Sequence, residues 1–262
     1  MSRDARWTSL LDLLAAEGRL DVEEAAAALN VSAATIRRDL DQLAEQQMLI
    51  RTRGGAVAHG VSYELPLRYR TARHTEQKQR IAAAVAAMVG AGEVVGLTGG
   101  TTTTEVARAL ALRGDLTGAA GRHPALTVVT NALNIAGELV IRPQIKLVVT
   151  GGVARPQSYE LTGPLAAGVL HEITLDLAVL GIDGIDPDEG VYAHHEDEAS
   201  TNRLLAQRAR RVVVATDSSK IGRRAFARIC ATGAVHTLVT DGGAPPAALA
   251  RFADAGVEVV TV

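Results

Sequence analysis

A glycine pair followed by four threonines is the segment of this sequence best suited to bind an anion. Thr98-Gly99-Gly100-Thr101-Thr102-Thr103-Thr104 directly follows the apolar run Val94–Leu97. Two glycines let backbone N–H groups turn toward one point, and the start of a following helix adds positive potential. The hydroxyls of Thr101, Thr102 and Thr103 can also donate to phosphate oxygens. The spacing predicts a phosphate site, and the alternative is a strand-to-helix turn with a Thr cap. Neither a Walker loop nor a dinucleotide fingerprint is present.

Polar or glycine-containing segments also follow four later apolar runs: Thr130-Asn131, Gly151-Gly152, Gly181-Ile182-Asp183-Gly184 and Asp217-Ser218-Ser219-Lys220. In an open α/β sheet, ligands bind outside the carboxyl ends of the strands. These segments are therefore expected to converge near the glycine–threonine loop. The residues expected to take part are Asn131, Gly152, Asp183, Asp217 and Lys220. Asp183 and Asp217 would bind sugar hydroxyls, and Lys220 would pair with a phosphate or a ring oxygen. Each has a simpler alternative as a helix cap or a turn residue.

The acidic segment His194-His195-Glu196-Asp197-Glu198 invites a metal-site interpretation. Adjacent side chains point apart, and the sequence offers no second His or Cys cluster to complete a ligand set. The segment is therefore interpreted as a solvated loop from which Glu198 enters the same site, without a metal ion.

A second group of residues lies near the N-terminus, where the segment from Ser32 to Leu40 reads Ser-Ala-Ala-Thr-Ile-Arg-Arg-Asp-Leu. With Ile36, Leu40 and Leu43 facing inward, the remaining side chains can face a DNA major groove, where Thr and Ala methyls touch thymine and Arg reaches guanine or phosphate. Arg51 and Arg53 follow on a short hairpin that would contact backbone phosphates. The alternative is an ordinary helical subdomain with solvated arginines. The predicted DNA-contacting residues are Ser32, Ala33, Ala34, Thr35, Arg37, Arg38, Arg51 and Arg53.

Two different hydrophobic periods position these groups. Helical spacing runs to about residue 47, with Asp21 and Ser32 as expected N-caps, and a hairpin is expected at 49–57. Apolar runs without alternation then predict a mostly parallel sheet covered on both faces. The predicted strands are 94–97, 126–130, 146–150, 177–181, 211–216, 237–240 and 258–262. The predicted helices between them are 103–113, 134–140, 165–172, 198–210 and 247–255. The expected organisation is a winged helix-turn-helix domain over 1–58, a linker over 59–75 and an α/β effector-binding domain over 76–262.

Charge and composition bound the possible functions. The 262 residues have 27 basic and 29 acidic side chains, a net charge of −2. The first 58 residues hold seven Arg and nine acids, so DNA binding depends on where the charges lie. No apolar run reaches the roughly 18 residues needed to cross a bilayer. The N-terminus lacks a secretory signal pattern. The single cysteine, Cys230, excludes an intrachain disulfide. A cytoplasmic protein without membrane association or cofactor is expected.

The N-terminal segment closely resembles the signature of the DeoR family of bacterial transcriptional regulators. The resemblance rests on Val31 to Leu40, then Leu43, then Arg53-Gly54-Gly55-Ala56. It implies that residues 32–46 bind double-stranded operator DNA. The sequence departs from the family at Gln47, where Gly usually closes the recognition helix.

The second half resembles the effector domain of the same family, which is similar to ribose-5-phosphate isomerase. The residues that carry this resemblance are Thr98–Thr103, Val129-Thr130-Asn131, Gly151-Gly152, Gly181–Gly184, Glu198 and Asp217–Lys220. The resemblance implies a ribose-5-phosphate-isomerase-like domain that binds a phosphorylated sugar. Many relatives carry Asp at the position of Thr98 and Lys at the position of Asn202.

The leading hypothesis is a regulator that responds to a sugar phosphate, acts as a homo-oligomer and is not an enzyme. The resemblance implies that it represses genes of carbohydrate metabolism. One alternative is an isomerase with Glu198 or Asp183 as base. Against it, Asp186-Pro187-Asp188-Glu189-Gly190 stands where isomerases have a Lys-Gly-Arg-Gly-Gly stretch that resembles an oxyanion cradle. A protein-interaction module without ligand is the third possibility.

Overall fold

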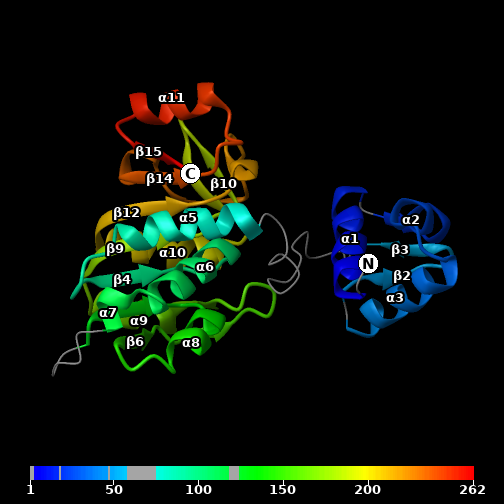
Figure 1. The fold of residues 1–262 in the computed structure, drawn as a ribbon, viewed down its shortest axis with the longest axis horizontal. Helices are drawn as coiled ribbons and strands as arrows, with labels where there is room; N and C mark the ends of the chain where they lie inside the picture. Colours follow the sequence, from blue (N-terminus) through cyan, green and yellow to red (C-terminus); the bar gives the residue numbers. More distant parts are fainter. Residues whose placement is uncertain (1–2, 18, 47, 58–74, 118–123) are drawn as a thin grey trace. The chain divides into compact units, whose positions relative to one another are not determined.

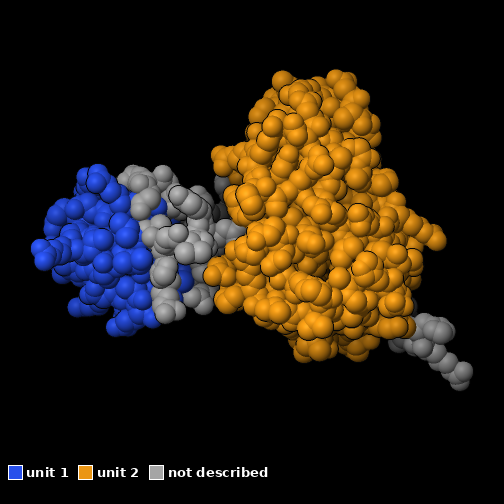
Figure 2. Space-filling model, turned by 180° about the vertical axis from the view of Figure 1, so that it is seen from behind, with its two compact units in different colours: residues 1–73 blue, residues 74–262 orange. Residues whose placement is uncertain are grey.

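The helical period at the start of the chain and the apolar runs after residue 93 belong to two compact units, residues 1–73 and 74–262 (Figure 2). The computed structural model describes residues 3–17, 19–46, 48–57, 75–117 and 124–262. The expected linker, apart from Thr75, lies outside the described residues, as do Gly18 and Gln47. The two units are described separately below.

The N-terminal unit consists of three helices and a small antiparallel sheet. The helices are α1 (Arg3–Glu17), α2 (Val22–Leu29) and α3 (Ala33–Glu45). The strands are β1 (Arg19–Asp21), β2 (Ile50–Arg51) and β3 (Gly55–Val57), in the order β1-β3-β2. Both predicted N-caps are confirmed, because Asp21 accepts from the N–H groups of Glu23 and Glu24, and Ser32 accepts from that of Thr35. The predicted hairpin is confirmed and gains β1 as a third strand.

Gly55 explains how β1 and β3 come together. A Cβ at this position would overlap the backbone carbonyl of Leu20, so only glycine allows the two strands to approach. Below the sheet, a core of fully buried side chains joins all three helices, with Leu10, Leu11, Ile36, Leu40 and Leu43 at 1% exposure or less. The inward direction predicted for Ile36, Leu40 and Leu43 is confirmed.

The C-terminal unit is built on seven parallel strands (Figure 1). They are β4 (Val94–Leu97), β5 (Leu126–Thr130), β6 (Ile145–Val149), β9 (Leu175–Leu180), β12 (Ala209–Ala215), β14 (Thr237–Thr240) and β15 (Glu258–Thr261). Their order is β15-β14-β12-β9-β4-β5-β6. The chain thus adds strands outward in one direction from β4 and then in the other from β9. Neighbours β4 and β9 form the switch point at which such sheets bind ligands.

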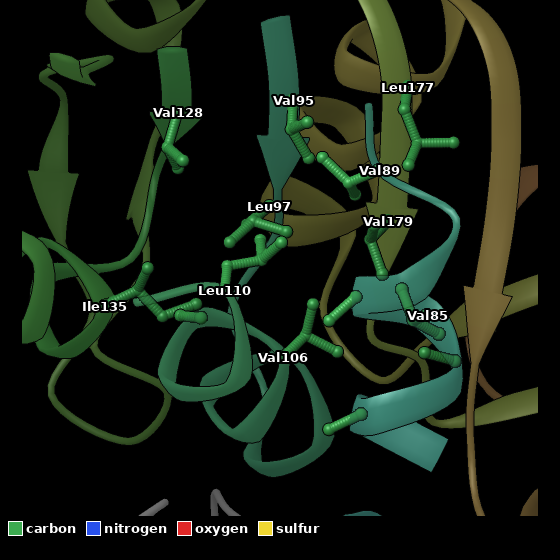
Figure 3. Close-up of a cluster of buried hydrophobic side chains, with 14 of the residues drawn as sticks. Val85, Val89, Val95, Leu97, Val106, Leu110, Val128, Ile135, Leu177 and Val179 are labelled. Atoms are coloured by element: carbon green, nitrogen blue, oxygen red, sulfur yellow. The ribbon is translucent and has the colours of Figure 1, made fainter. Parts of the chain in front are cut away.

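Helices cover both faces of this sheet, as the non-alternating apolar runs predict. They are α5 (Thr75–Ala87), α6 (Thr101–Ala111), α7 (Gly114–Thr117), α8 (Leu133–Leu139), α9 (Pro164–His171), α10 (Glu196–Gln207) and α11 (Pro246–Asp254). On one face, α5, α6 and α8 bury residues such as Val85, Val106 and Ile135 against Val95 and Leu177 (Figure 3). A second core, with fully buried Phe252 of α11, covers the other face.

Several elements are absent from the sequence-based prediction. Helix α5 precedes the sheet. A three-stranded antiparallel sheet has the order β10-β11-β13, and β7 pairs with β8. These strands are β7 (Val153–Ala154), β8 (Leu161–Thr162), β10 (Gly184–Asp186), β11 (Gly190–Ala193) and β13 (Ala227–Cys230), with short 3₁₀ helices η1 (Ser218–Lys220) and η2 (Thr232–Ala234). Within the described part of the chain, no helix has the length and apolarity needed to span a membrane.

Candidate functional site

In the N-terminal unit, helix α3 has an exposed outer face, and a buried hydrogen-bond network holds its inner face. Asp39 is 3% exposed and accepts from Nε1 of Trp7 at 2.9 Å and from the guanidinium of Arg6. These bonds attach the inner face of α3 to α1. The hydrogen bond that Arg6 donates to Asp39 raises the pKa of Arg6, so the guanidinium keeps its charge. The network fixes the orientation of α3 while its outer face stays in solvent.

The residues predicted to contact DNA differ in their exposure to solvent and in the contacts that they make within the protein. Ala34, Arg37 and Arg38 are exposed. Arg37 pairs with Glu23 at 3.0 Å, and both side chains are more than half exposed. Ala33 is half-buried and packs partly against the helical core, so it offers less surface to a groove than Ala34 does. The Thr35 hydroxyl lies 2.8 Å from that of Ser32, so these two residues also share the cap of α3.

The two wing arginines also differ from each other. Arg51 Nε donates to Asp41 at 2.7 Å, and its Nη1 donates to the Gly55 carbonyl, so this side chain holds the hairpin onto α3. Arg53 is exposed at the turn of the hairpin. Of the pair, Arg53 is better placed to meet a phosphate without giving up an internal contact.

In the C-terminal unit, the glycine–threonine loop lies at the switch point between β4 and β9. The buried Thr98 hydroxyl accepts from the Gly181 N–H at 2.8 Å and so ties the loop after β4 to the loop after β9. Gly100 has φ +132° and is the N-cap of α6, where it offers no side-chain cap. The first-turn N–H groups of α6 therefore remain for another acceptor. The hydroxyls of Thr103 and Thr104 donate to the Gly100 carbonyl, at 3.1 and 2.6 Å.

A buried acid, Glu160, connects this loop to the neighbouring strands. Its Oε2 accepts from Nδ2 of Asn131 at 3.0 Å, and a Cβ added at Gly99 would clash with its side chain. Asn131 Nδ2 also lies 3.3 Å from Oδ1 of Asn202 on α10. Asn131 is fully buried, and its Oδ1 has no hydrogen-bond partner within the described residues. An unpartnered buried acceptor is costly unless a ligand or water satisfies it.

Two ion pairs border this buried centre. Arg155 Nη1 donates to Oε1 of Glu198 at 2.8 Å, with both side chains largely buried. Lys220 Nζ lies 3.9 Å from Oδ1 of Asp183, while Oδ2 of Asp183 accepts from the His194 N–H at 3.0 Å. At 3.9 Å and 29% side-chain exposure, Lys220 can reach a second anion. We call these groups the strand-end cluster: Thr98, Gly99, Gly100, Asn131, Arg155, Glu160, Asp183, Glu198, Asn202 and Lys220.

Burial is the main influence on the charge of Glu160. Burial first, and then the nearby carboxylates of Glu198 and Asp183, raise the pKa of Glu160 to about 8, although hydrogen bonds from Asn131 and Asn202 act the other way. The carboxyl is therefore mostly neutral at pH 7. The strand-end cluster carries fewer negative charges than its acids suggest.

Some predicted site residues also have a role in the fold. Asp217 caps η1 by accepting from the Ser219 N–H at 3.1 Å and so fixes the turn that presents Lys220. Gly152, with φ +123°, lies against the backbone of Thr162 where β7 pairs with β8. Thr102 is buried and Thr101 partly exposed in the first turn of α6. Within the described residues, no group of three or more His, Cys, Asp and Glu side chains is arranged to hold a metal ion.

The sequence interpretation did not include Glu160 or Arg155. Both lie in the segment between β6 and β8, which has no clear hydrophobic period. Glu160 stands between Tyr159 and Leu161, next to apolar and hydroxyl side chains. That setting is the one available signal that this acid is buried, and it does not identify the loop around Gly99 as its neighbour.

Comparison with known proteins bears on both units. The DeoR-like helix-turn-helix domain matches residues 6–60, and the DeoR C terminal sensor domain matches residues 73–242. The glycerol-3-phosphate regulon repressor of Escherichia coli (strain K12) is 33% identical over 246 residues, which cover 94% of this chain and 93% of that protein. The HTH-type transcriptional repressor CsqR of the same organism is 31% identical over 261 residues, 99% of this chain and 96% of that protein.

Among solved structures, ribose 5-phosphate isomerase A from Methanocaldococcus jannaschii aligns with 56% of this chain and 54% of its own, at 18% identity and a TM-score of 0.42. The family matches cover both units, and the two relatives given above, which match nearly end to end, are named as repressors. The chain therefore belongs to the DeoR family of DNA-binding transcriptional regulators.

Proposed function

We propose that this protein is a repressor of carbohydrate-metabolism genes whose binding to double-stranded operator DNA is modulated by a phosphorylated sugar. The observation that carries the proposal is the uncapped N-terminus of α6 at the switch point of the sheet, beside the side chains of the strand-end cluster. A helix N-terminus favours a phosphate, and the neighbouring acids and Asn131 suit sugar hydroxyls. Relatives named for the control of glycerol-3-phosphate and other regulons support the same assignment.

The proposed effector contacts use the two ends of such a ligand. The phosphate would meet the N–H groups of Gly100 and the first turn of α6, together with Lys220. The hydroxyls would meet Asp183 and the unpartnered Oδ1 of Asn131. A phosphorylated sugar satisfies both sets, whereas a free sugar leaves the N–H groups unpaired and inorganic phosphate leaves Asp183 and Asn131 unused. The phosphorylated sugar is therefore expected to bind more tightly than either fragment.

A role as a regulator rather than an enzyme is also supported by the state of the two candidate bases. Glu198 is engaged by Arg155, and Asp183 accepts from the His194 N–H and faces Lys220. A general base needs a carboxylate that is free to take a proton from the substrate. Sugar binding without turnover fits this arrangement.

The proposed DNA complex requires more than one copy of the chain. One α3 helix spans a single half-site, and the acidic balance of the first 58 residues gives little non-specific affinity. A dimer or larger even oligomer doubles the contacts with a palindromic operator. Sedimentation of the free and DNA-bound protein tests this point, and a monomer that binds its operator tightly would contradict it.

The decisive experiment measures operator binding and effector response separately. Fluorescence anisotropy with the DNA upstream of the protein's own gene is followed during titration with sugar phosphates, the matching free sugars and inorganic phosphate. Lys220→Ala should keep its operator affinity and lose about 1.5–3 kcal/mol of effector binding, the range for a hydrogen bond to a charged group. Lys146→Ala, an exposed lysine on β6, is the matched control. A normal response of Lys220→Ala, or equal binding of a sugar and its phosphate, would refute the assignment.

A further inference from the structure

Glu160 is the acid of the strand-end cluster that has no counter-ion. Its side chain belongs to a residue only 5% exposed, and within the described residues no cation lies within ion-pair distance. Its hydrogen-bond partners are the neutral amides of Asn131 and Asn202. A buried carboxylate without a cation is strongly disfavoured, whereas a buried carboxylic acid is tolerated.

The Glu160 side chain also occupies the space beside the anion-binding loop. Gly99 is not among the glycines with positive φ, so its backbone would accept an alanine. A Cβ there would nevertheless lie 2.7 Å from Cδ of Glu160. Glycine is thus required at this position because the carboxyl is packed against it. Any anion held by the first turn of α6, two residues further along, would lie near this carboxyl.

The charged groups around Glu160 come from four parts of the C-terminal unit. Glu198 on α10 and Asp183 after β9 face it as negative charges, and Arg155, from the turn before β8, is paired to Glu198. Lys220, after β12, is directed to Asp183. The loop at 98–100 and the end of β5 contribute no charged side chain. A proton on Glu160 therefore removes a negative charge that neither basic side chain balances directly.

We propose that Glu160 is a specificity-determining residue of the effector site. Its carboxyl closes the Gly99 side of the loop and admits an anionic ligand only while it is uncharged. As a neutral acid it also offers an O–H donor, which a carboxylate lacks. The inference rests on the proposed function, since it assumes that an anion binds at α6. It adds the requirement that Glu160 is uncharged when the anion binds, which the other residues of the site do not impose.

The test is calorimetric titration of the full chain at pH 7 and pH 9. The ligands are glycerol 3-phosphate, glucose 6-phosphate and inorganic phosphate, and the proteins are wild type, Glu160→Gln and the control Glu172→Gln, an exposed acid at the end of α9. With a pKa of about 8, the neutral fraction of Glu160 falls about tenfold between these pH values. Wild type and control should therefore lose about tenfold in affinity, and Glu160→Gln less than twofold. The two phosphate esters are already mostly dianions at pH 7, and lysine remains charged at pH 9, so neither accounts for a change in the affinity for these esters.

A second measurement tests the contact without any ligand. Gly99→Ala should lower the melting temperature in the wild-type background and have little effect in the Glu160→Ala background, because the clash is then removed. Equal effects in both backgrounds would refute the contact. Affinity that is unchanged with pH, or that falls equally in Glu160→Gln, would overturn the inference and leave the phosphosugar site standing. Failure of all three ligands to bind at either pH would overturn both.

Discussion

The acids that pair with the predicted DNA-contacting arginines and the acids of the strand-end cluster have opposite surroundings. On the N-terminal unit, Glu23 and Asp41 are exposed and pair with the arginines Arg37 and Arg51. In the strand-end cluster, Glu198 and Glu160 are at most 5% exposed, and Glu160 has neutral partners alone. Exposed ion pairs contribute about 0–1 kcal/mol, whereas buried charges are costly to leave unpaired.

This contrast has a functional consequence. Arg37, which is in a weak surface pair, can exchange a carboxylate for a DNA phosphate at little cost, so the acidic balance of the N-terminal unit does not prevent DNA binding. A ligand at the strand-end cluster, by contrast, must satisfy buried groups that already have defined partners. The first surface suits reversible binding to a polyanion, and the second suits selection among small molecules.

The largest effect is expected at Asp39, a buried acid of the N-terminal unit. Asp39→Ala removes the acceptor of Arg6 and Trp7 and should destabilise this unit by about 3–5 kcal/mol, the range for breaking a buried ion pair. Trp7 is the single tryptophan of the chain, so its fluorescence during urea denaturation reports this unit. Asp41→Ala, which breaks an exposed pair, is the control and should cost about 1 kcal/mol or less. Similar losses in both variants would remove the distinction between buried and exposed acids.

The next effect concerns DNA contacts on the exposed face of α3. If Arg38 contacts a base, Arg38→Ala should cost about 1–3 kcal/mol on the specific operator and much less on random DNA. Arg53→Ala should weaken binding to both DNAs and flatten the salt dependence, as expected for a phosphate contact. Gel shifts on the two DNAs over a range of salt concentrations separate these outcomes. Unchanged operator affinity in both variants would contradict the assignment of α3 and its hairpin.

A further effect concerns the pH dependence of the C-terminal unit. Because the pKa of Glu160 rises from about 4.5 to about 8 on folding, the folded state binds more protons between these values. Its contribution to stability is complete below about pH 4.5 and is lost as the pH rises through about 8, by at most about 1.4 kcal/mol per pH unit. Glu160→Gln should remove this slope. Thermal melts of the wild type and the variant from pH 5.5 to 8.5 check it, and parallel curves would argue against a buried acid.

Asp241, another acid of the C-terminal unit, has the opposite effect on the pH dependence of stability, and its effect falls at lower pH. Although burial works against its ionisation, N–H donors from Ser218 and Gly243 hold the pKa of Asp241 below its ordinary value. Its stabilising contribution is present above its unfolded pKa and is lost on acidification. Restricting the melts to pH 5.5 and above therefore separates the effect of Glu160 from that of Asp241.

The smallest effect is expected at Glu23. Glu23→Ala breaks the exposed pair with Arg37, so it should change stability by no more than about 1 kcal/mol. Operator affinity should rise slightly, because a negative charge near the DNA is removed and Arg37 is released. Anisotropy titration at low salt is the sensitive measurement. A clear loss of affinity would mean that Glu23 is needed to orient Arg37.

Much of the fold follows from local patterns. The caps at Asp21 and Ser32, the inward stripe of α3 and the seven apolar strands are each encoded within a few consecutive residues, and the structure confirms them. At most of the strands, the predicted and observed boundaries differ by one or two residues, because apolar runs do not mark where hydrogen bonding begins. Helix α5 and the β10-β11-β13 sheet were missed. The pairing of β1 with β3 was missed as well, since it joins Arg19 to Val57 across two intervening helices, α2 and α3.

The sequence by itself determined which residues follow the strands, and hence that Thr98, Asn131, Asp183 and Lys220 belong to one end of the sheet. Chain order alone fixes which side chains come directly after each strand, and the carboxyl ends of parallel strands lie at the same edge of the sheet. Only the tertiary structure decided which strands are neighbours, that β4 and β9 meet at the switch point, and that Glu160 lies against Gly99. Those contacts join residues up to 83 positions apart, as in the bond between Thr98 and Gly181. Burial and charge depend on such long-range packing, so the neutral state of Glu160 has no counterpart in the local sequence.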